Sequence, residues 1–230
     1  MFRFKQFSIE DDQCAHSVGT DGVLLGAWAQ VEGRHRILDI GTGSGLIALM
    51  AAQREPHARV VGIEIDPAAA QQARKNVERS PFAKRVDIKE EDVKIFHTEE
   101  EFDCILCNPP FFTEDTLSPD ANRARARHAT LLRFPELISS ACRMLSANGE
   151  FHVILPASEE VSFVNQCFIN GLKLTRCCQV RTVSRKNPKR VLLSFAQEGN
   201  IATKHEELVL QNTDGSRSES YSDLTKDFYL

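Results

Sequence analysis

The sequence lacks the long apolar stretch that a membrane-spanning helix requires, which is ~20 residues. Its N-terminus has neither the apolar core nor the cleavage site of a secretion signal, so we expect a cytoplasmic protein. It also lacks internal repeats and low-complexity segments, and its composition excludes disorder across the whole chain. A chain of 230 residues with ordinary apolar and charged fractions predicts one globular domain.

The seven cysteines are odd in number, and most of them lie within apolar segments. Without a secretion signal, we expect them to be reduced and buried as small hydrophobic side chains. Cys104 and Cys107 form a Cys-x-x-Cys pair, a spacing that also occurs in zinc and redox sites. No second pair follows at ligand spacing and the segment is strand-like, so we predict packing residues and no metal.

The net charge of −4 by itself argues against a nucleic-acid partner. The charges are unevenly distributed, however, because residues 87–103 are strongly acidic while residues 173–190 contain no acid. The second stretch carries seven basic residues, namely Lys173, Arg176, Arg181, Arg185, Lys186, Lys189 and Arg190. One basic surface on an acidic body is compatible with local binding of a polyanion.

From residue 36 onward, apolar strand-like runs alternate with helical patterns. We predict strands at 37–40, 59–65, 86–88, 102–107 and 150–155, and helices at 46–54, 67–80, 134–145 and 158–170. The runs 172–183 and 190–196 are joined without a helix, so this last pair is expected to be antiparallel. The result is an α/β fold with a mostly parallel seven-stranded sheet, an antiparallel last strand and helices on both faces. A further strand at 207–210 and a short terminal helix follow.

A glycine-rich turn, Asp39-Ile40-Gly41-Thr42-Gly43-Ser44-Gly45, joins the first of these strands to the next helix. Its glycines let the backbone turn sharply and approach a ligand without an intervening Cβ. The spacing is Gly-x-Gly-x-Gly after an acid, which differs from the Gly-x-Gly-x-x-Gly of dinucleotide binders. The turn also lacks the Gly-Lys-Ser/Thr of a phosphate loop, so no nucleoside triphosphate is implied.

Acidic residues follow the next two predicted strands. Glu64 lies at the tip of the second strand, where a carboxylate can accept hydrogen bonds from both hydroxyls of a ribose. Asp66 precedes Pro67 and is better suited to capping the following helix. Asp92 follows the third strand, where an acid can meet an adenine amino group, although a solvated acidic loop is an equally ordinary interpretation.

The segment Asn108-Pro109-Pro110-Phe111 follows the apolar run 102–107. The two prolines restrict the backbone, and they hold an amide side chain, a carbonyl and an aromatic face in one small site. Such a site suits a planar NH2 group that must be gripped and drawn away from planarity. A plain Pro-Pro turn with a capping asparagine is the structural alternative.

The set formed by Asp39, Gly41, Gly43, Gly45, Glu64 and Asp92 resembles the cofactor site of Rossmann-like class I methyltransferases that use S-adenosylmethionine. The likeness covers residues 36–196. Asn-Pro-Pro-Phe resembles the signature of methyltransferases that act on planar nitrogens: adenine N6, guanine N2 or the glutamine amide. It implies that the Asn108 side-chain oxygen and the Pro109 carbonyl accept the two N–H groups, beside Pro110, and that Phe111 stacks on the base. Orientation and aligned hydrogen bonds supply the rate in that chemistry, without a metal or a strong general base.

Segments 2–9, 16–28, 123–129, 188–195 and 224–230 are similar to those of bacterial enzymes that methylate N6 of an adenine in a valine tRNA. This resemblance spans the chain. It implies a target adenine beside the anticodon, in a single-stranded loop whose bases can be splayed out. The expected organisation is a single domain over 1–230, with a lead-in at 1–35, a core at 36–199 and an extension at 200–230. We expect a monomer with no obligate protein partner.

Further candidate residues follow from this family likeness. Thr20 and Gly22 open a helix that either folds over the methionine end of the cofactor or is merely capped there, with Leu24, Leu25 and Trp28 facing the core. Candidate phosphate contacts lie in two segments, and they are Arg123, Arg125, Arg127 and His128, followed by Arg185, Lys186, Lys189 and Arg190.

Three other functions remain open. A release-factor glutamine methyltransferase shares the Asn-Pro-Pro-aromatic signature, but that family carries a helical domain ahead of the cofactor fold, and here 38 residues precede Asp39. An rRNA guanine N2-methyltransferase also acts on an exocyclic amine, and the Asn-Pro-Pro-Phe motif does not distinguish between such amines. A non-catalytic binding module would use the fold as a surface, although both groups of candidate residues are intact.

Overall fold

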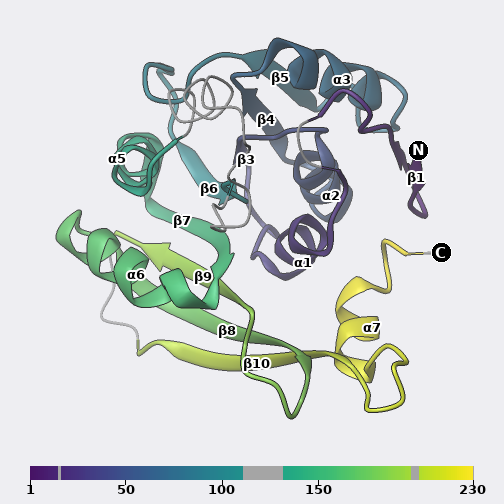
Figure 1. Cartoon of the computed structure of the whole chain (residues 1–230). Helices are drawn as coiled ribbons and strands as arrows, with labels where there is room; N and C mark the ends of the chain where they lie inside the picture. Colours follow the sequence, from purple (N-terminus) through teal and green to yellow (C-terminus); the bar gives the residue numbers. More distant parts are fainter. Residues whose placement is uncertain (15–16, 111–131, 198–201, 230) are drawn as a thin grey trace, which may run out of the picture.

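The computed structural model describes residues 1–14, 17–110, 132–197 and 202–229 (Figure 1). Within these residues, eight strands form one sheet in the order β10-β8-β9-β7-β6-β3-β4-β5. The strands at the centre and on one side are β3 (Arg36–Ile40), β4 (Arg59–Glu64), β5 (Val86–Glu90), β6 (Phe102–Cys107) and β7 (Leu145–Pro156). On the other side lie β8 (Lys173–Val183), β9 (Arg190–Ala196) and β10 (Lys204–Gln211).

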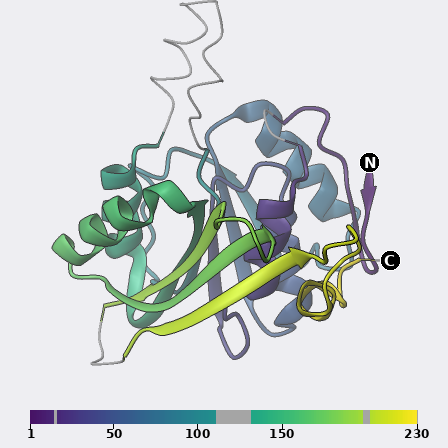
Figure 2. The ribbon, with the colours of Figure 1, turned by 60° about the horizontal axis from the view of Figure 1, so that its bottom comes forward.

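The strand directions confirm the predicted mixed sheet. β9 is antiparallel to both of its neighbours, β7 and β8, whereas the other pairings in the sheet are parallel. The sequence predicted seven strands in this sheet, but the structure has eight, because β10 pairs with the outer edge of β8 (Figure 2). Ion pairs from Arg176 to Glu206 and from Arg181 to Glu207 join the two strands at 3.0 and 2.9 Å. The sequence predicts the strand, but it does not indicate this partner.

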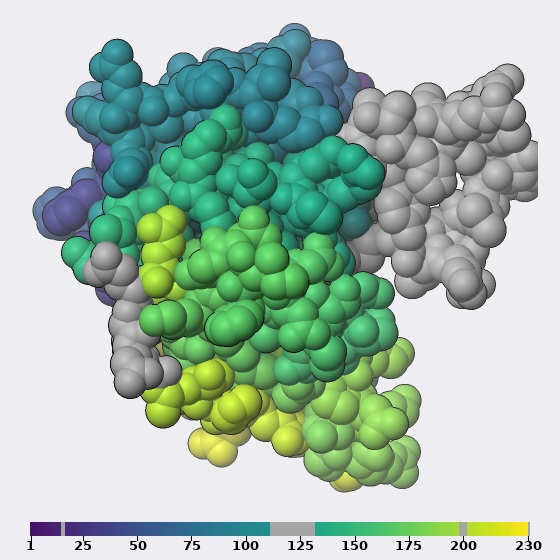
Figure 3. Space-filling view, turned by 90° about the vertical axis from the view of Figure 1, so that its left-hand side faces the viewer, coloured from purple at the N-terminus to yellow at the C-terminus, as the bar shows by residue number. Residues whose placement is uncertain are grey.

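Helices cover both faces of the sheet, as predicted (Figure 1). One hydrophobic core joins the sheet to α1 (Thr20–Trp28), α2 (Leu46–Arg54), α3 (Pro67–Glu78) and the terminal helix α7 (Glu219–Thr225). A second core lies beneath α5 (Phe134–Met144) and α6 (Glu160–Ile169), which is preceded by the 3-10 turn Ala157–Glu159. Figure 3 shows the molecule from the side of α5 and α6.

One local feature differs from the sequence expectation. Helix α5 passes directly into β7 at Leu145, so residues 146–149, which the sequence assigned to neither helix nor strand, lie within the strand. The pairing of β6 with β7 shifts register in that region, which accommodates the extra residues of β7.

The cysteine prediction is confirmed for the pair on β6. Cys104 and Cys107 are almost completely buried, and their side chains belong to different cores on the two faces of the sheet. Burial raises the pKa of both thiols well above the ordinary value. Side chains three positions apart on a strand point to opposite faces, so this pair cannot share a ligand.

The N-terminal and C-terminal segments lie side by side. The short strands β1 (Phe2–Arg3) and β2 (Ser8–Ile9) pair with each other, and the Lys5 amide donates to the Phe228 carbonyl at 2.9 Å. The Phe4 and Tyr229 rings stack with centroids 6.0 Å apart. No helix in the described part of the chain is long and apolar enough to cross a membrane.

Candidate active site

The glycine-rich turn joins β3 to α2 at the carboxyl edge of the sheet. Gly41, Gly43 and Gly45 have φ angles of 69°, 54° and 84°, which are strained for residues with a side chain. A Cβ placed on Gly41 or Gly43 would meet no protein atom within 4 Å. Open space beside a strained loop is what close approach of a ligand to the backbone requires.

Asp39 supports this turn from beneath. Its side chain is fully buried, and Oδ2 accepts hydrogen bonds from Thr42 Oγ1 at 2.6 Å and from the Ala48 amide at 3.2 Å. Oδ1 is buried, and within the described part of the chain it has no hydrogen-bond partner. Burial raises the pKa of Asp39 to about 7, and the negative charge of Glu64 adds to this effect. A nearby cation would therefore favour the charged carboxylate.

Glu64 lies at the end of β4, next to the turn. One carboxylate oxygen accepts from the Gly43 amide at 2.9 Å, and the other accepts from the Asp66 amide at 3.0 Å. Each oxygen has a further lone pair, so the carboxylate can still accept from a ligand hydroxyl. Asp66 accepts from the amides of Ala68 and Ala69, which confirms it as the N-cap of α3.

Asp92 follows the end of β5 and has a more local environment. Its carboxylate accepts from the Lys94 amide at 2.9 Å and pairs with the Lys94 ammonium at 3.3 Å. These bonds are those of a polar turn. Asp92 also lies one strand beyond Glu64, at the same edge of the sheet.

Asn108 follows β6 directly, and β6 pairs with β3 so that Cys107 lies opposite Ile40. The asparagine is therefore next to the start of the glycine turn. Its Oδ1 atom is buried and has no hydrogen-bond partner among the described residues. Pro109 is buried and Pro110 is exposed, whereas Phe111 lies outside the described residues.

The start of α1 lies against the start of α2. Gly19 is the N-cap, and no side chain caps the helix, so Thr20 is an exposed first-turn residue and not the cap that the sequence suggests. A Cβ on Gly22 would come within 3.1 Å of the Leu46 side chain, so this glycine permits close packing of the two helices. Leu24, Leu25 and Trp28 are buried as predicted.

The basic stretch 173–190 is partly neutralised by acids from other elements. Besides the pairs of Arg176 and Arg181, Arg190 Nε lies 2.8 Å from Asp21 Oδ2 on α1. Arg185, Lys186 and Lys189 are exposed on the turn between β8 and β9. The other candidate RNA contacts, Arg123, Arg125, Arg127 and His128, lie outside the described residues.

Two side chains at this edge of the sheet were not expected from the sequence. Asp21 is one, because its contact with Arg190 joins residues far apart in the chain. Asn76 is the other, a buried asparagine in α3 that contacts the backbone of the glycine turn. A signal for Asn76 was present, since asparagine is a poor helix former and α3 is otherwise rich in alanine.

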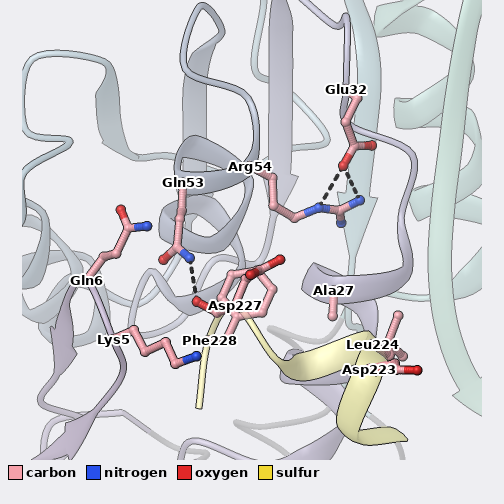
Figure 4. A pocket seen from close by; sticks show the side chains of 10 residues that line it. All are labelled: Lys5, Gln6, Ala27, Glu32, Gln53, Arg54, Asp223, Leu224, Asp227 and Phe228. Atoms are coloured by element: carbon pink, nitrogen blue, oxygen red, sulfur yellow. Dashed lines mark hydrogen bonds and ion pairs between the residues drawn. The ribbon is translucent and has the colours of Figure 1, made fainter. Parts of the chain in front are cut away.

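A surface hollow of about 530 Å³ lies where the two ends of the chain meet α1 and α2 (Figure 4). Several of its polar side chains are bonded within the protein: Gln53 donates to the Asp227 carbonyl at 2.8 Å, and Arg54 pairs with Glu32 at 2.8 Å. None of the candidate site residues lines it. This hollow therefore lies where the two ends of the chain pack against the core, and it is separate from the candidate site.

Among the described residues, no group of three or more metal-ligating side chains is present. What the site does contain is two buried oxygens, on Asp39 and Asn108, at the ends of adjacent parallel strands, and neither has a partner in the part of the chain that the structure describes. They flank a strained glycine turn that leaves open space. This arrangement can hold a cationic ligand and an N–H donor side by side.

Comparison with known proteins agrees with this chemistry. The family model described as methyltransferase small domain matches residues 19–170, which is more than half of the chain. A predicted O-methyltransferase from Agrobacterium tumefaciens has the same fold, with a TM-score of 0.71, 19% identity, and coverage of 90% of this chain and 96% of that one. The chain is therefore a methyltransferase with a class I fold, a class that implies the use of S-adenosylmethionine.

Full-length relatives define the family more narrowly. Proteins named tRNA1(Val) (adenine(37)-N6)-methyltransferase from Bacteroides thetaiotaomicron and Phocaeicola vulgatus are 42% and 44% identical to the chain. Each alignment covers 100% of this chain and 97% of the relative. The chain belongs to this family of enzymes.

Proposed function

We propose that this enzyme transfers a methyl group from S-adenosylmethionine to N6 of the adenine at position 37 of a valine tRNA. The names of its relatives support the base and the RNA. The observation that carries the chemistry is the buried, unpartnered Asn108 Oδ1 beside the glycine turn, because it is an acceptor without a donor.

The cofactor pocket consists of the glycine turn and the residues around it. The residues fit a cationic nucleoside, since Gly41 and Gly43 leave room for it and the Asp39 carboxylate gains a partner for its charged form. Glu64 would accept from the ribose hydroxyls. The complete proposed set is Thr20, Gly22, Asp39, Gly41, Gly43, Gly45, Glu64, Asp92 and Asn108.

S-adenosylmethionine supplies an electrophilic methyl group on a sulfonium centre. The protein must make the adenine amino group nucleophilic, because its lone pair is delocalised into the ring. Asn108 Oδ1 and the Pro109 carbonyl each accept one N–H, and this fixes the direction of the lone pair. Pro110 restricts the backbone behind them, and Phe111 provides the surface on which the flipped base stacks.

The tRNA would be held by basic residues at the same edge of the sheet. Arg185, Lys186 and Lys189 on the β8–β9 turn are exposed and suited to phosphate contacts. Arg190 pairs with Asp21, so a phosphate would compete with the Asp21 carboxylate for the Arg190 guanidinium. We retain Arg123, Arg125, Arg127 and His128 as proposed contacts on the basis of their position after the acceptor motif. The enzyme would act in the cytoplasm, as a monomeric single domain without an obligate partner.

The test is methyl transfer to tRNA that lacks the modification. The protein is incubated with radiolabelled S-adenosylmethionine and bulk tRNA from a strain without the gene, and the nucleosides are then separated. Label in N6-methyladenosine of a valine tRNA supports the proposal. Methylguanosine, or label confined to protein, contradicts it and points to the guanine or glutamine enzymes.

A further inference from the structure

Asn76 is buried in the last turn of α3, with 1% of its surface exposed. Its amide makes hydrogen bonds to two segments that lie far apart in the sequence. Nδ2 donates to the Ser44 carbonyl at 2.9 Å and to the Glu10 carbonyl at 2.7 Å, while Oδ1 accepts from the Glu10 amide at 3.0 Å. One side chain thus joins the N-terminal segment to the glycine turn.

The interaction is specific for an asparagine. The amide offers two donors and an acceptor, so it pairs with both backbone groups of Glu10 and keeps one N–H for Ser44. Ser44 lies between Gly43 and Gly45, so its carbonyl belongs to the part of the turn that has positive φ angles on both sides. An aspartate of the same shape would have no donors, and it would place a charge against two carbonyls.

The N-terminal segment continues from this point along the carboxyl edge of the sheet. Glu10 is also held by Arg79 at 2.7 Å, and in Figure 1 the purple segment passes alongside α3. Cys14 lies within electrostatic range of Glu64 and Asp66, whose charges add to the effect of burial in raising its pKa to about 11. The segment formed by residues 8–14 is therefore anchored at the glycine turn through Glu10 and Asn76.

We propose that Asn76 is a positioning residue for the cofactor site, which ties residues 8–14 to the glycine turn and holds the turn in its binding shape. This rests on the proposed role of that turn in binding S-adenosylmethionine. Since the turn is strained, its shape depends on the hydrogen bonds and packing that surround it. Removal of the hydrogen bond to Ser44 is expected to weaken cofactor binding while leaving the affinity for tRNA unchanged.

Calorimetric titration of S-adenosylmethionine into the full-length protein tests this. Asn76→Ala should weaken binding about 10- to 100-fold, the range expected for removal of buried hydrogen bonds. Asn76→Asp retains the shape and the acceptor but has neither donor, so it should weaken binding at least as much. Both variants should raise KM for the cofactor and leave KM for tRNA unchanged.

Two control variants separate positioning from general stability. Ser80→Ala removes a buried hydroxyl at the end of the same helix that donates to the Val77 carbonyl at 2.7 Å and does not contact the glycine turn. Glu10→Ala removes the ion pair with Arg79 but retains the backbone bonds to Asn76. Thermal unfolding of all four variants is measured in parallel, and the two controls should keep cofactor affinity within about twofold, as expected for sites that are not linked to the cofactor.

The outcomes distinguish this inference from the proposed function. A wild-type protein that does not bind S-adenosylmethionine refutes the proposed function. A wild-type protein that binds it, together with Asn76 variants of normal affinity, refutes the inference alone. If the Asn76 variants fail to fold, amide hydrogen exchange on the wild-type protein decides: cofactor binding should slow exchange in residues 8–14, and unchanged exchange there overturns the proposal.

Discussion

Replacing Asn108 with alanine should separate catalysis from folding. In the folded protein Asn108 Oδ1 is buried and accepts no hydrogen bond from the residues that the structure describes. An unpaired buried polar group costs about 1–3 kcal/mol. Alanine removes that cost along with some of the packing around the side chain, so we expect the free energy of unfolding to stay constant or to rise by about 1 kcal/mol. For a chain of this length, that corresponds to a melting temperature higher by about 2–4 °C.

Turnover should change in the opposite direction. Removal of one aligned hydrogen-bond partner at a reacting group lowers kcat by about 10²–10³-fold. The assay is single-turnover methylation of unmodified tRNA at saturating labelled S-adenosylmethionine, with thermal unfolding and calorimetric cofactor binding on the same preparations. Asn108→Asp is the matched variant, because it keeps an acceptor oxygen at the same position and should retain more activity than alanine.

Three results would refute this reasoning. Cofactor affinity that falls more than about tenfold in the alanine variant, equivalent to ~1.4 kcal/mol, would mean that Asn108 mainly shapes the cofactor pocket. Turnover of the alanine variant that equals that of Asn108→Asp would mean that the acceptor oxygen does not orient the amino group. A melting temperature several degrees lower would show that Oδ1 has a partner in solution.

Three further predictions concern charges. The pKa of Asp39 is raised to about 7 from an ordinary value of 3.8, so between these pH values the folded protein holds a proton that the unfolded chain releases. The free energy of unfolding should therefore fall as the pH rises from about 4 to about 7, by on the order of 4 kcal/mol. Urea unfolding across that range checks it, and Asp39→Asn should flatten the dependence. Asp21→Ala should maintain or strengthen tRNA binding in filter-binding assays, because it removes the carboxylate that competes with phosphate for Arg190. Arg190→Ala should weaken tRNA binding in the same assay. Weaker binding by both variants would assign the pair a structural role. The last prediction concerns the exposed turn residues Arg185, Lys186 and Lys189. Neutralising them should reduce the slope of log K for tRNA binding against log salt concentration by about 0.7–0.9 for each phosphate that the protein no longer neutralises. An unchanged slope would remove the turn from the RNA interface.

Much of the site could be predicted because its parts are local. A glycine turn between a strand and a helix, an aspartate before a helix-starting proline, and Asn-Pro-Pro after an apolar run each depend on neighbours within a few residues. In parallel strands the carboxyl ends meet at one edge, so alternation of strands and helices also predicts that these segments come together. Asp39, Glu64 and Asn108 lie at that edge for this reason.

The errors concern features that local sequence does not contain. The expected seven strands became eight because β10 pairs with β8, and the run at 207–210 predicts a strand without indicating its neighbour. The basic stretch 173–190 looked continuous, but acids from β10 and α1 pair with three of its arginines. The contact of Asp92 with an adenine stays a prediction, because the carboxylate bonds to Lys94 within its own polar turn.

The sequence by itself determined the order of strands and helices, the positive-φ turn at Gly41, Gly43 and Gly45, and the acceptor motif at Asn108. These follow from periodicity and from the backbone preferences of glycine and proline, which act over short distances. The tertiary structure alone decided which distant groups hold the site in place. Asn76 bonds to a residue 66 positions away, and Arg190 to one 169 positions away. Such pairs arise only when the sheet and its helices bring their buried or charged groups together, where each must find a partner.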